Sequence, residues 1–174
     1  MDIRSKLMTA AEQVFDRHGF AATGMARLIG EAGLSSRTVY KHAGSKTALM
    51  AAVLRQRHQR FFAAVAGRSV DDLFASMETW VREEGARGCL FFRAQAETGR
   101  ALPEIEAVVA DYHAQLVALI DERVAAELGR PDTELAEQVL VLFEGATTAA
   151  SYRGAGAITA ARAGAGQLIA ARCS

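Results

Sequence analysis

The chain has 174 residues, of which 51% are hydrophobic, and its 20 basic and 20 acidic side chains cancel at neutral pH. This length allows one compact domain, or a small domain joined to a larger one, with enough apolar residues for a core. Two cysteines are too few for a disulfide framework, and no apolar run approaches a membrane span, so we expect a soluble, cytoplasmic protein.

The charges are unevenly divided along the chain. Residues 1–60 hold ten Lys and Arg against four Asp and Glu, whereas residues 61–174 hold ten against sixteen. A basic N-terminal segment joined to an acidic remainder indicates a polyanionic partner for the first segment alone. The composition, rich in alanine, with two prolines and no asparagine, favours helix over strand.

Apolar residues recur at helical spacing from the beginning of the chain. They predict a first helix over residues 2–18, whose apolar positions are Ile3, Leu7, Ala10, Ala11, Val14 and Phe15. A second helix should follow Thr23, its expected N-cap, and present Met25, Leu28, Ile29 and Ala32. Gly33 should end it, because glycine readily adopts the left-handed conformation that closes a helix.

The stretch Gly33-Leu-Ser-Ser-Arg-Thr-Val-Tyr-Lys-His-Ala-Gly-Ser-Lys46 predicts a third helix of about two turns, capped by Ser35. Only Val39 is clearly apolar in this helix, so most of its surface should face something other than a core. A short helix, a glycine turn and a second helix with cationic and aromatic side chains are typical of a helix-turn-helix.

The rest of the chain also predicts helices, which makes the expected fold all-α with about nine helices in total. The short apolar segment 89–97 is interpreted as a buried helix, although its periodicity alone also allows a strand. The other predicted helices cover residues 46–66, follow the caps Ser69 and Asp132, begin at Pro103, and cover residues 158–172.

The stretch from Ala32 to Lys46 resembles the DNA-binding signature of the TetR-type transcriptional regulators. The resemblance extends back through residues 10–20 and Thr23 and forward to Leu49, about the first quarter of the chain. It implies a three-helix DNA-binding domain with a helix-turn-helix over residues 1–46. It also implies a larger helical domain for effector binding and dimerisation over residues 47–174, connected by the helix of residues 46–66.

The third helix carries the candidate DNA contacts. The forked guanidinium of Arg37 suits guanine, and Thr38 can contact a thymine methyl or a phosphate. The resemblance assigns backbone contacts to Thr23, Thr38, Tyr40, His42 and Lys46, and it leaves Ser36, Arg37 and Lys41 as the better candidates for base contacts. The full predicted set is Thr23, Ser35, Ser36, Arg37, Thr38, Tyr40, Lys41, His42 and Lys46.

The resemblance also implies an effector pocket and a dimer interface. Candidate pocket residues, each singly more typical of a core, are Trp80, Cys89, Phe92, Gln95, Tyr112, His113 and Phe143. Small residues in the last two helices permit close helix approach, either between two copies or within one chain. The interface candidates are Leu142, Ala146, Ala149, Ala161, Ala165, Leu168 and Ile169.

The sequence shows no Gly-rich phosphate loop and no nucleophile elbow, and its four His and two Cys lack metal-ligand spacing. We therefore expect no enzyme, no metal and no cofactor. The resemblance implies a homodimeric repressor that a small, largely apolar molecule releases from a palindromic operator. The alternative is a DNA-binding regulator controlled by thiol oxidation at Cys89 or by a protein partner, without a small-molecule effector.

Overall fold

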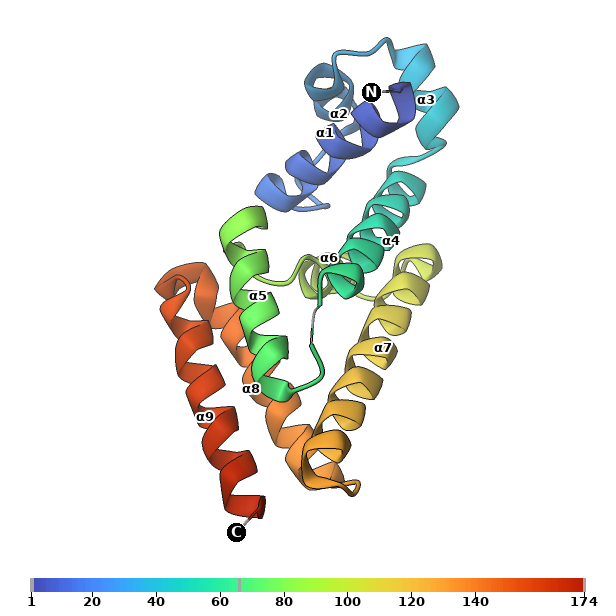
Figure 1. Cartoon of the computed structure of the whole chain (residues 1–174). Helices are drawn as coiled ribbons and strands as arrows, with labels where there is room; N and C mark the ends of the chain where they lie inside the picture. The colour runs from blue at the N-terminus through green and yellow to red at the C-terminus, as the bar shows by residue number, and fades with distance from the viewer. Residues whose placement is uncertain (1, 66, 174) are drawn as a thin grey trace. The chain divides into compact units, whose positions relative to one another are not determined.

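The computed structural model describes residues 2–65 and 67–173, and this part of the chain is helical nearly throughout (Figure 1). It contains nine helices and no strand, so the all-α prediction is confirmed, and the segment 89–97 is helical from Leu90 onward. The helices are α1 (Ile3–His18), α2 (Met25–Ala32), α3 (Ser36–Ala43), α4 (Lys46–Ala64), α5 (Val70–Glu84), α6 (Leu90–Thr98), α7 (Pro103–Leu128), α8 (Thr133–Arg153) and α9 (Gly156–Cys173). The predicted end of the fourth helix at residue 66 lies outside the described residues.

Most helix starts lie where hydroxyl and carboxylate side chains predict them. Ser35 accepts a hydrogen bond from the Thr38 N–H, and Ser45 accepts one from the Ala48 N–H at the start of α4. Ser69 and Asp72 form a reciprocal capping box on α5, and Asp132 caps α8. Each cap satisfies a backbone donor that the helix itself leaves without an acceptor.

The predicted cap of α2 is wrong. Gly24 occupies the N-cap position and offers no side-chain hydrogen bond. Thr23 is one residue too early and only 1% exposed, and its hydroxyl donates to the Gly19 carbonyl at 2.6 Å. This buried hydrogen bond therefore stabilises the turn between α1 and α2.

The chain divides into two compact units, Met1–Gln59 with Leu90–Tyr112, and Arg60–Cys89 with His113–Ser174. The first unit joins α1, α2, α3 and most of α4 to α6 and the beginning of α7. The domain boundary that the sequence analysis places at residue 46 stays a prediction.

The first unit has an apolar core crossed by one buried ion pair. Phe15, Leu28 and Val39 are fully buried, which joins the stripes of α1, α2 and α3 around the start of α4 (Figure 1). Beside this core, the Arg57 guanidinium of α4 donates to the Glu12 carboxylate of α1 at 2.8 Å. The two side chains are only 8% and 12% exposed, so water screens this pair little.

Helix α6 is tied to α1 by polar contacts. Arg93 donates to the Asp16 backbone carbonyl at 2.9 Å, and its guanidinium lies 3.5 Å from the Asp16 carboxylate. One turn later on α6, the Glu97 carboxylate accepts a hydrogen bond from the Ala21 N–H at 2.7 Å. These contacts fix α6 to the last turn of α1 and to the turn that precedes α2.

In the second unit, α8 and α9 run antiparallel side by side, and α9 also packs on α5 (Figure 1). Aromatic rings fill the core, with Phe143 lying 6.3 Å from Phe61 and 5.8 Å from Phe74 between ring centroids. Arg162 of α9 forms a two-pronged ion pair with Asp71 of α5, and this partner holds the pKa of the Asp71 carboxyl below its usual value.

We expect the buried ion pair to be costly to break from one side. Because Arg57→Met would leave the Glu12 carboxylate buried beside an apolar group, it should lower the free energy of unfolding by about 3–5 kcal/mol. The double variant Glu12→Leu/Arg57→Met should lose clearly less, since neither charge then remains. Urea denaturation followed by circular dichroism measures both. If the single and double variants lose equal free energy of unfolding, the unpaired buried charge is not what destabilises Arg57→Met.

Candidate nucleic-acid interface

The turn between α2 and α3 depends on a glycine. Gly33 has φ 56° and ψ 40°, the left-handed conformation, and its N–H donates to the Gly30 carbonyl at 3.1 Å. A residue with a Cβ would be strained there, whereas glycine is not. The turn thereby ends α2 and leads into α3, which begins at Ser36.

Burial separates the two sides of α3. Val39 and Ala43 are buried and fix the helix on the core. The opposite side is exposed along its whole length, with Tyr40 51% exposed. The predicted contacts on this exposed side are Ser36, Arg37, Tyr40, Lys41 and His42. The structure thus brings five of the nine predicted residues together on one solvent-facing surface with cationic, aromatic and hydroxyl groups.

Two further predicted residues lie at the start of the same helix. The hydroxyls of Ser35 and Thr38 are 2.8 Å apart, and the Thr38 N–H donates to Ser35 Oγ at 3.2 Å. No acidic residue occupies the first turn of α3, so its positive dipole end is not neutralised. Backbone N–H groups at such a helix start favour a phosphate oxygen.

The last two predicted residues have partners inside the protein. The Lys46 ammonium donates to the Phe20 carbonyl at 3.0 Å and lies 4.1 Å from the centre of the Phe20 ring. Thr23 is buried, and its N–H donates to the same Phe20 carbonyl at 3.2 Å. Both residues therefore order the α1–α2 turn, and their contact with DNA stays a prediction.

The predicted effector residues are distributed over both units. In the first unit, Tyr112 stacks on Phe91 with ring centroids 3.9 Å apart, and Phe92 is 42% exposed. In the second unit, Trp80 lies edge-on to Phe61 at 5.4 Å, and Phe143 contacts the same ring. Cys89 and His113 are half-buried, Cys89 immediately before α6.

Gln95 has a partner that the sequence analysis missed. Its side-chain N–H donates to Glu106 Oε2 of α7 at 3.0 Å. The other carboxylate oxygen, Glu106 Oε1, is buried and has no hydrogen-bond partner among the described residues. Buried polar atoms almost always have a hydrogen-bond partner, so a ligand that donates a hydrogen bond to this oxygen would be favoured. In the sequence, the only signal of Glu106 is that it follows the apolar Ile105. This signal is too weak to identify it as a site residue.

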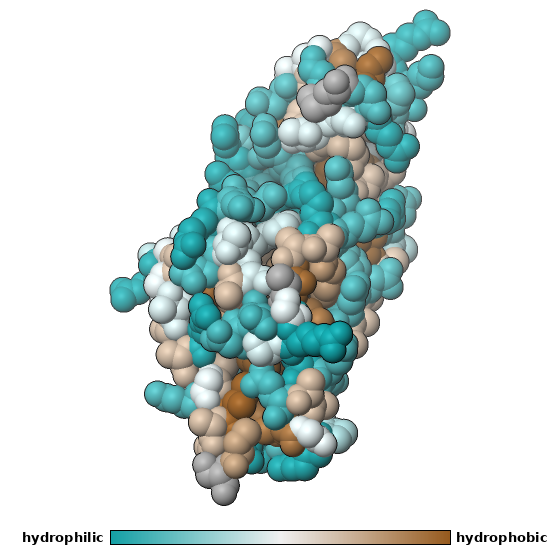
Figure 2. All heavy atoms as spheres, in the orientation of Figure 1, coloured by the Kyte–Doolittle hydropathy of each residue, from teal (hydrophilic) through white to brown (hydrophobic). Residues whose placement is uncertain are grey.

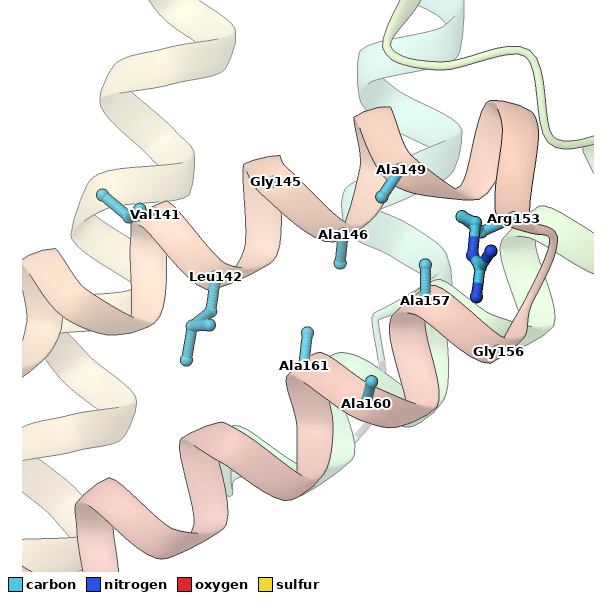
Figure 3. Close-up of a pocket in the computed structure, with 10 residues that line it drawn as sticks. All are labelled: Val141, Leu142, Gly145, Ala146, Ala149, Arg153, Gly156, Ala157, Ala160 and Ala161. Atoms are coloured by element: carbon cyan, nitrogen blue, oxygen red, sulfur yellow. The ribbon is translucent and has the colours of Figure 1, made fainter.

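Four of the seven predicted interface residues line a groove of about 580 Å³ between α8 and α9 (Figure 3). Leu142 and Ala146 project from α8 toward α9, while Ala161 projects back toward α8, and Ala149 lies one turn farther along α8. The remaining three lie on α9, where Ala165 is buried within the chain and Leu168 and Ile169 are half-buried.

Exposed apolar side chains border this groove. Val141 at its edge is 63% exposed, and Tyr152 near the end of α8 is 76% exposed. Apolar side chains also gather around the last turns of α9 (Figure 2). On α8, burial raises the pKa of the Glu144 carboxyl, and the neighbouring charge of Glu137 raises it further. A face of this kind disfavours further negative charge.

The described part of the chain lacks two other kinds of site. None of its helices combines the length and the apolar character needed to cross a bilayer. Residues 2–65 and 67–173 also contain no group of three or more His, Cys, Asp or Glu that could hold a metal ion.

The family comparison matches residues 7–53 to the bacterial regulatory proteins of the tetR family. This range contains the turn at Gly33 and the exposed surface of α3. This part of the chain is similar to the regulatory proteins of the tetR family. This similarity to a family of regulatory proteins confirms the predicted resemblance and agrees with the expectation that the chain is not an enzyme.

A curated relative is similar over a longer range. The HTH-type transcriptional regulator UidR of Escherichia coli K12 is 25% identical over 126 residues, which are 70% of this chain and 64% of UidR. The chain thus matches less than two thirds of the length of that curated relative.

Solved structures extend the likeness to the whole fold. The TetR-family regulator SCO4454 from Streptomyces coelicolor superposes with a TM-score of 0.90 at 21% identity, covering 99% of this chain and 96% of that one. The TetR-type protein sav143 from Streptomyces avermitilis superposes with a TM-score of 0.80 at 27% identity, covering 99% and 98% of the two chains.

Proposed function

We propose that this chain is a homodimeric TetR-family transcriptional repressor of the cytoplasm, which binds a palindromic DNA operator and is released by a small molecule. The observation that carries the proposal is the surface of α3. Its buried side consists of Val39 and Ala43, while its other side exposes Arg37, Tyr40 and Lys41 together. An exposed surface of this composition, on a helix held by a helix-turn-helix, suits the major groove.

The proposed contacts divide by chemistry. Arg37 and Lys41 can donate to the O6 and N7 atoms of guanine, so they read sequence, and Ser36 lies beside them. Thr38, Tyr40 and His42 donate to phosphates and so set the position of α3 on the duplex. Thr23 and Lys46 stabilise the α1–α2 turn, and the remaining N–H groups of the Lys46 ammonium are available to a phosphate.

The proposed dimer uses the α8–α9 face. Two copies would bury Val141 and cover the apolar groove in which Leu142 and Ala149 lie. A two-fold pair would also present two copies of α3, which a palindromic operator requires at a spacing of about one helical turn.

The proposed effector acts in the part of the first unit where α6 meets α7. Glu106 Oε1 is a buried acceptor, and Gln95, which donates to the other oxygen, lies one turn after Phe91 of the Phe91–Tyr112 stack on α6. The effector should therefore combine an aromatic body with at least one hydrogen-bond donor. Because α6 also holds α1 through Arg93 and Glu97, a shift of α6 would act on the α1–α2 turn and favour a weaker DNA-binding conformation.

Selection from a pool of random DNA duplexes tests the DNA assignment. The wild type should enrich a palindrome with two half-sites. Arg37→Ala should relax the preference at one base pair per half-site, a loss of about 1–3 kcal/mol in discrimination. Tyr40→Phe should weaken all enriched sequences to a similar degree, because a phosphate contact carries no sequence information. An Arg37→Ala profile identical to that of the wild type would remove Arg37 from base reading, and no enrichment by the wild type would refute the proposal.

Val141→Glu tests the dimer. Val141 is already exposed, so its replacement should leave a single chain folded, but it would place a charge in the interface of each copy at a cost of several kcal/mol. Sedimentation velocity should show dimers for the wild type and monomers for the variant. Val117→Glu is the matched control, since Val117 is an exposed valine on α7. An intact Val141→Glu dimer would move the interface elsewhere.

A thermal-shift screen tests the effector class. Aromatic compounds would be compared in pairs that differ by one amino or hydroxyl donor, and the donor-bearing members should raise the melting temperature. Saturating ligand at a hundred times Kd stabilises by about 2.7 kcal/mol, which is readily measured. Glu106→Leu should abolish the difference within each pair, whereas Glu104→Leu on the exposed surface of α7 should keep it. An unchanged difference in Glu106→Leu would contradict the role of this carboxylate.

A further inference from the structure

A second basic surface lies in the first unit, away from α3. A groove of about 420 Å³ runs between α1 and α4. Its polar lining consists of Arg4 and Ser5 from α1 with Arg55, Gln56 and Gln59 from α4. All five side chains are exposed, and none of the residues that line the groove is acidic.

The two arginines of the groove differ from the other arginines of α4. Arg57 is paired with Glu12, and Arg60 is paired with Glu84 at 3.1 Å. Across residues 2–65 and 67–173, neither Arg4 nor Arg55 forms an ion pair with a carboxylate. The groove therefore holds two guanidinium charges that no carboxylate of the described residues neutralises.

This arrangement has the chemistry of a phosphate site. Each guanidinium can donate two parallel hydrogen bonds to phosphate oxygens, a geometry that an ammonium cannot reproduce. The Ser5 hydroxyl and the amides of Gln56 and Gln59 are neutral donors that can complete the shell without repelling the anion. We propose that the groove between α1 and α4 binds a phosphate group through Arg4 and Arg55.

The favoured source of the phosphate is the DNA backbone, and in this respect the inference rests on the proposed function. The beginning of α1 lies beside the helix-turn-helix, because the Lys6 ammonium is 3.5 Å from the position that a Cβ on Gly33 would take. Arg4 is two residues earlier on the same helix. A phosphate outside the site of α3 would extend the contact between this unit and a duplex.

The experiment compares Arg4→Gln, Arg55→Gln and the double variant with the wild type. Arg17→Gln is the control, because Arg17 is an exposed arginine of α1 that does not line the groove. All three replaced side chains are exposed, so circular dichroism and thermal melting should show unchanged folding in each variant. One arm titrates a labelled duplex of arbitrary sequence at several salt concentrations. The other arm titrates inorganic phosphate and follows its 31P line width.

Loss of one phosphate contact per subunit should make the slope of log K against log salt shallower by about 0.9 per subunit. If the groove variants show this loss and Arg17→Gln does not, the groove binds DNA phosphate. If the slope is unchanged but the wild type broadens the phosphate line and the double variant does not, the groove takes a free phosphate compound. If neither arm responds, the inference is overturned.

The two proposals can fail separately. A wild type that binds no duplex even at low salt refutes the proposed function, while the inorganic phosphate arm still decides whether the groove is an anion site.

Discussion

The Glu97 carboxylate accepts a hydrogen bond from the Ala21 N–H, and the organisation of the first unit depends on this contact. Gly19 makes the contact possible, because a Cβ at this position would fall on the Glu97 carboxylate, and its φ of 79° favours glycine in any case. The same short turn supplies Phe20, whose carbonyl holds Lys46 at the start of α4. Helices α4 and α6 are thus both held by the few residues between α1 and α2.

This convergence gives the proposed regulation a physical route. A hydrogen bond to a charged group contributes about 1.5–3 kcal/mol, and coupling between regulatory sites is typically about 1–3 kcal/mol. Losing the contacts of Arg93 and Glu97 would therefore change the relative free energies of the conformations of the α1–α2 turn by an amount similar to a typical regulatory coupling. No long chain of intermediate residues is required, since α6 reaches that turn directly.

The sequence predicted local features better than distant ones. Helix periodicity and the caps at Ser35, Ser69 and Asp132 depend on residues a few positions apart, and the structure confirms them. Thr23 does not cap α2, because its buried hydroxyl donates to the Gly19 carbonyl and does not accept a hydrogen bond from a backbone N–H at the start of α2. Residue type and spacing alone cannot distinguish these two partners.

The exposed side of α3 was predictable for the same local reason, since one apolar residue among polar ones leaves little choice of orientation. The contacts of Arg93 and Glu97 were not, because their partners lie 77 and 76 residues away in the sequence. Glu106 was missed because a carboxylate beside an apolar stripe is usually solvated. Only the fold shows that one of its oxygens is buried.

Hydrogen exchange at the α1–α2 turn tests most directly whether α6 controls this region. Mass spectrometry would compare the wild type with Glu97→Ala, which removes the acceptor of the Ala21 N–H, and would use Glu83→Ala, at an exposed glutamate of α5, as the control. We predict faster exchange in peptides covering residues 19–32 for Glu97→Ala and no change there for the control. Unchanged exchange in this segment, with α6 still folded, would contradict the claim that the Glu97 contact positions the turn.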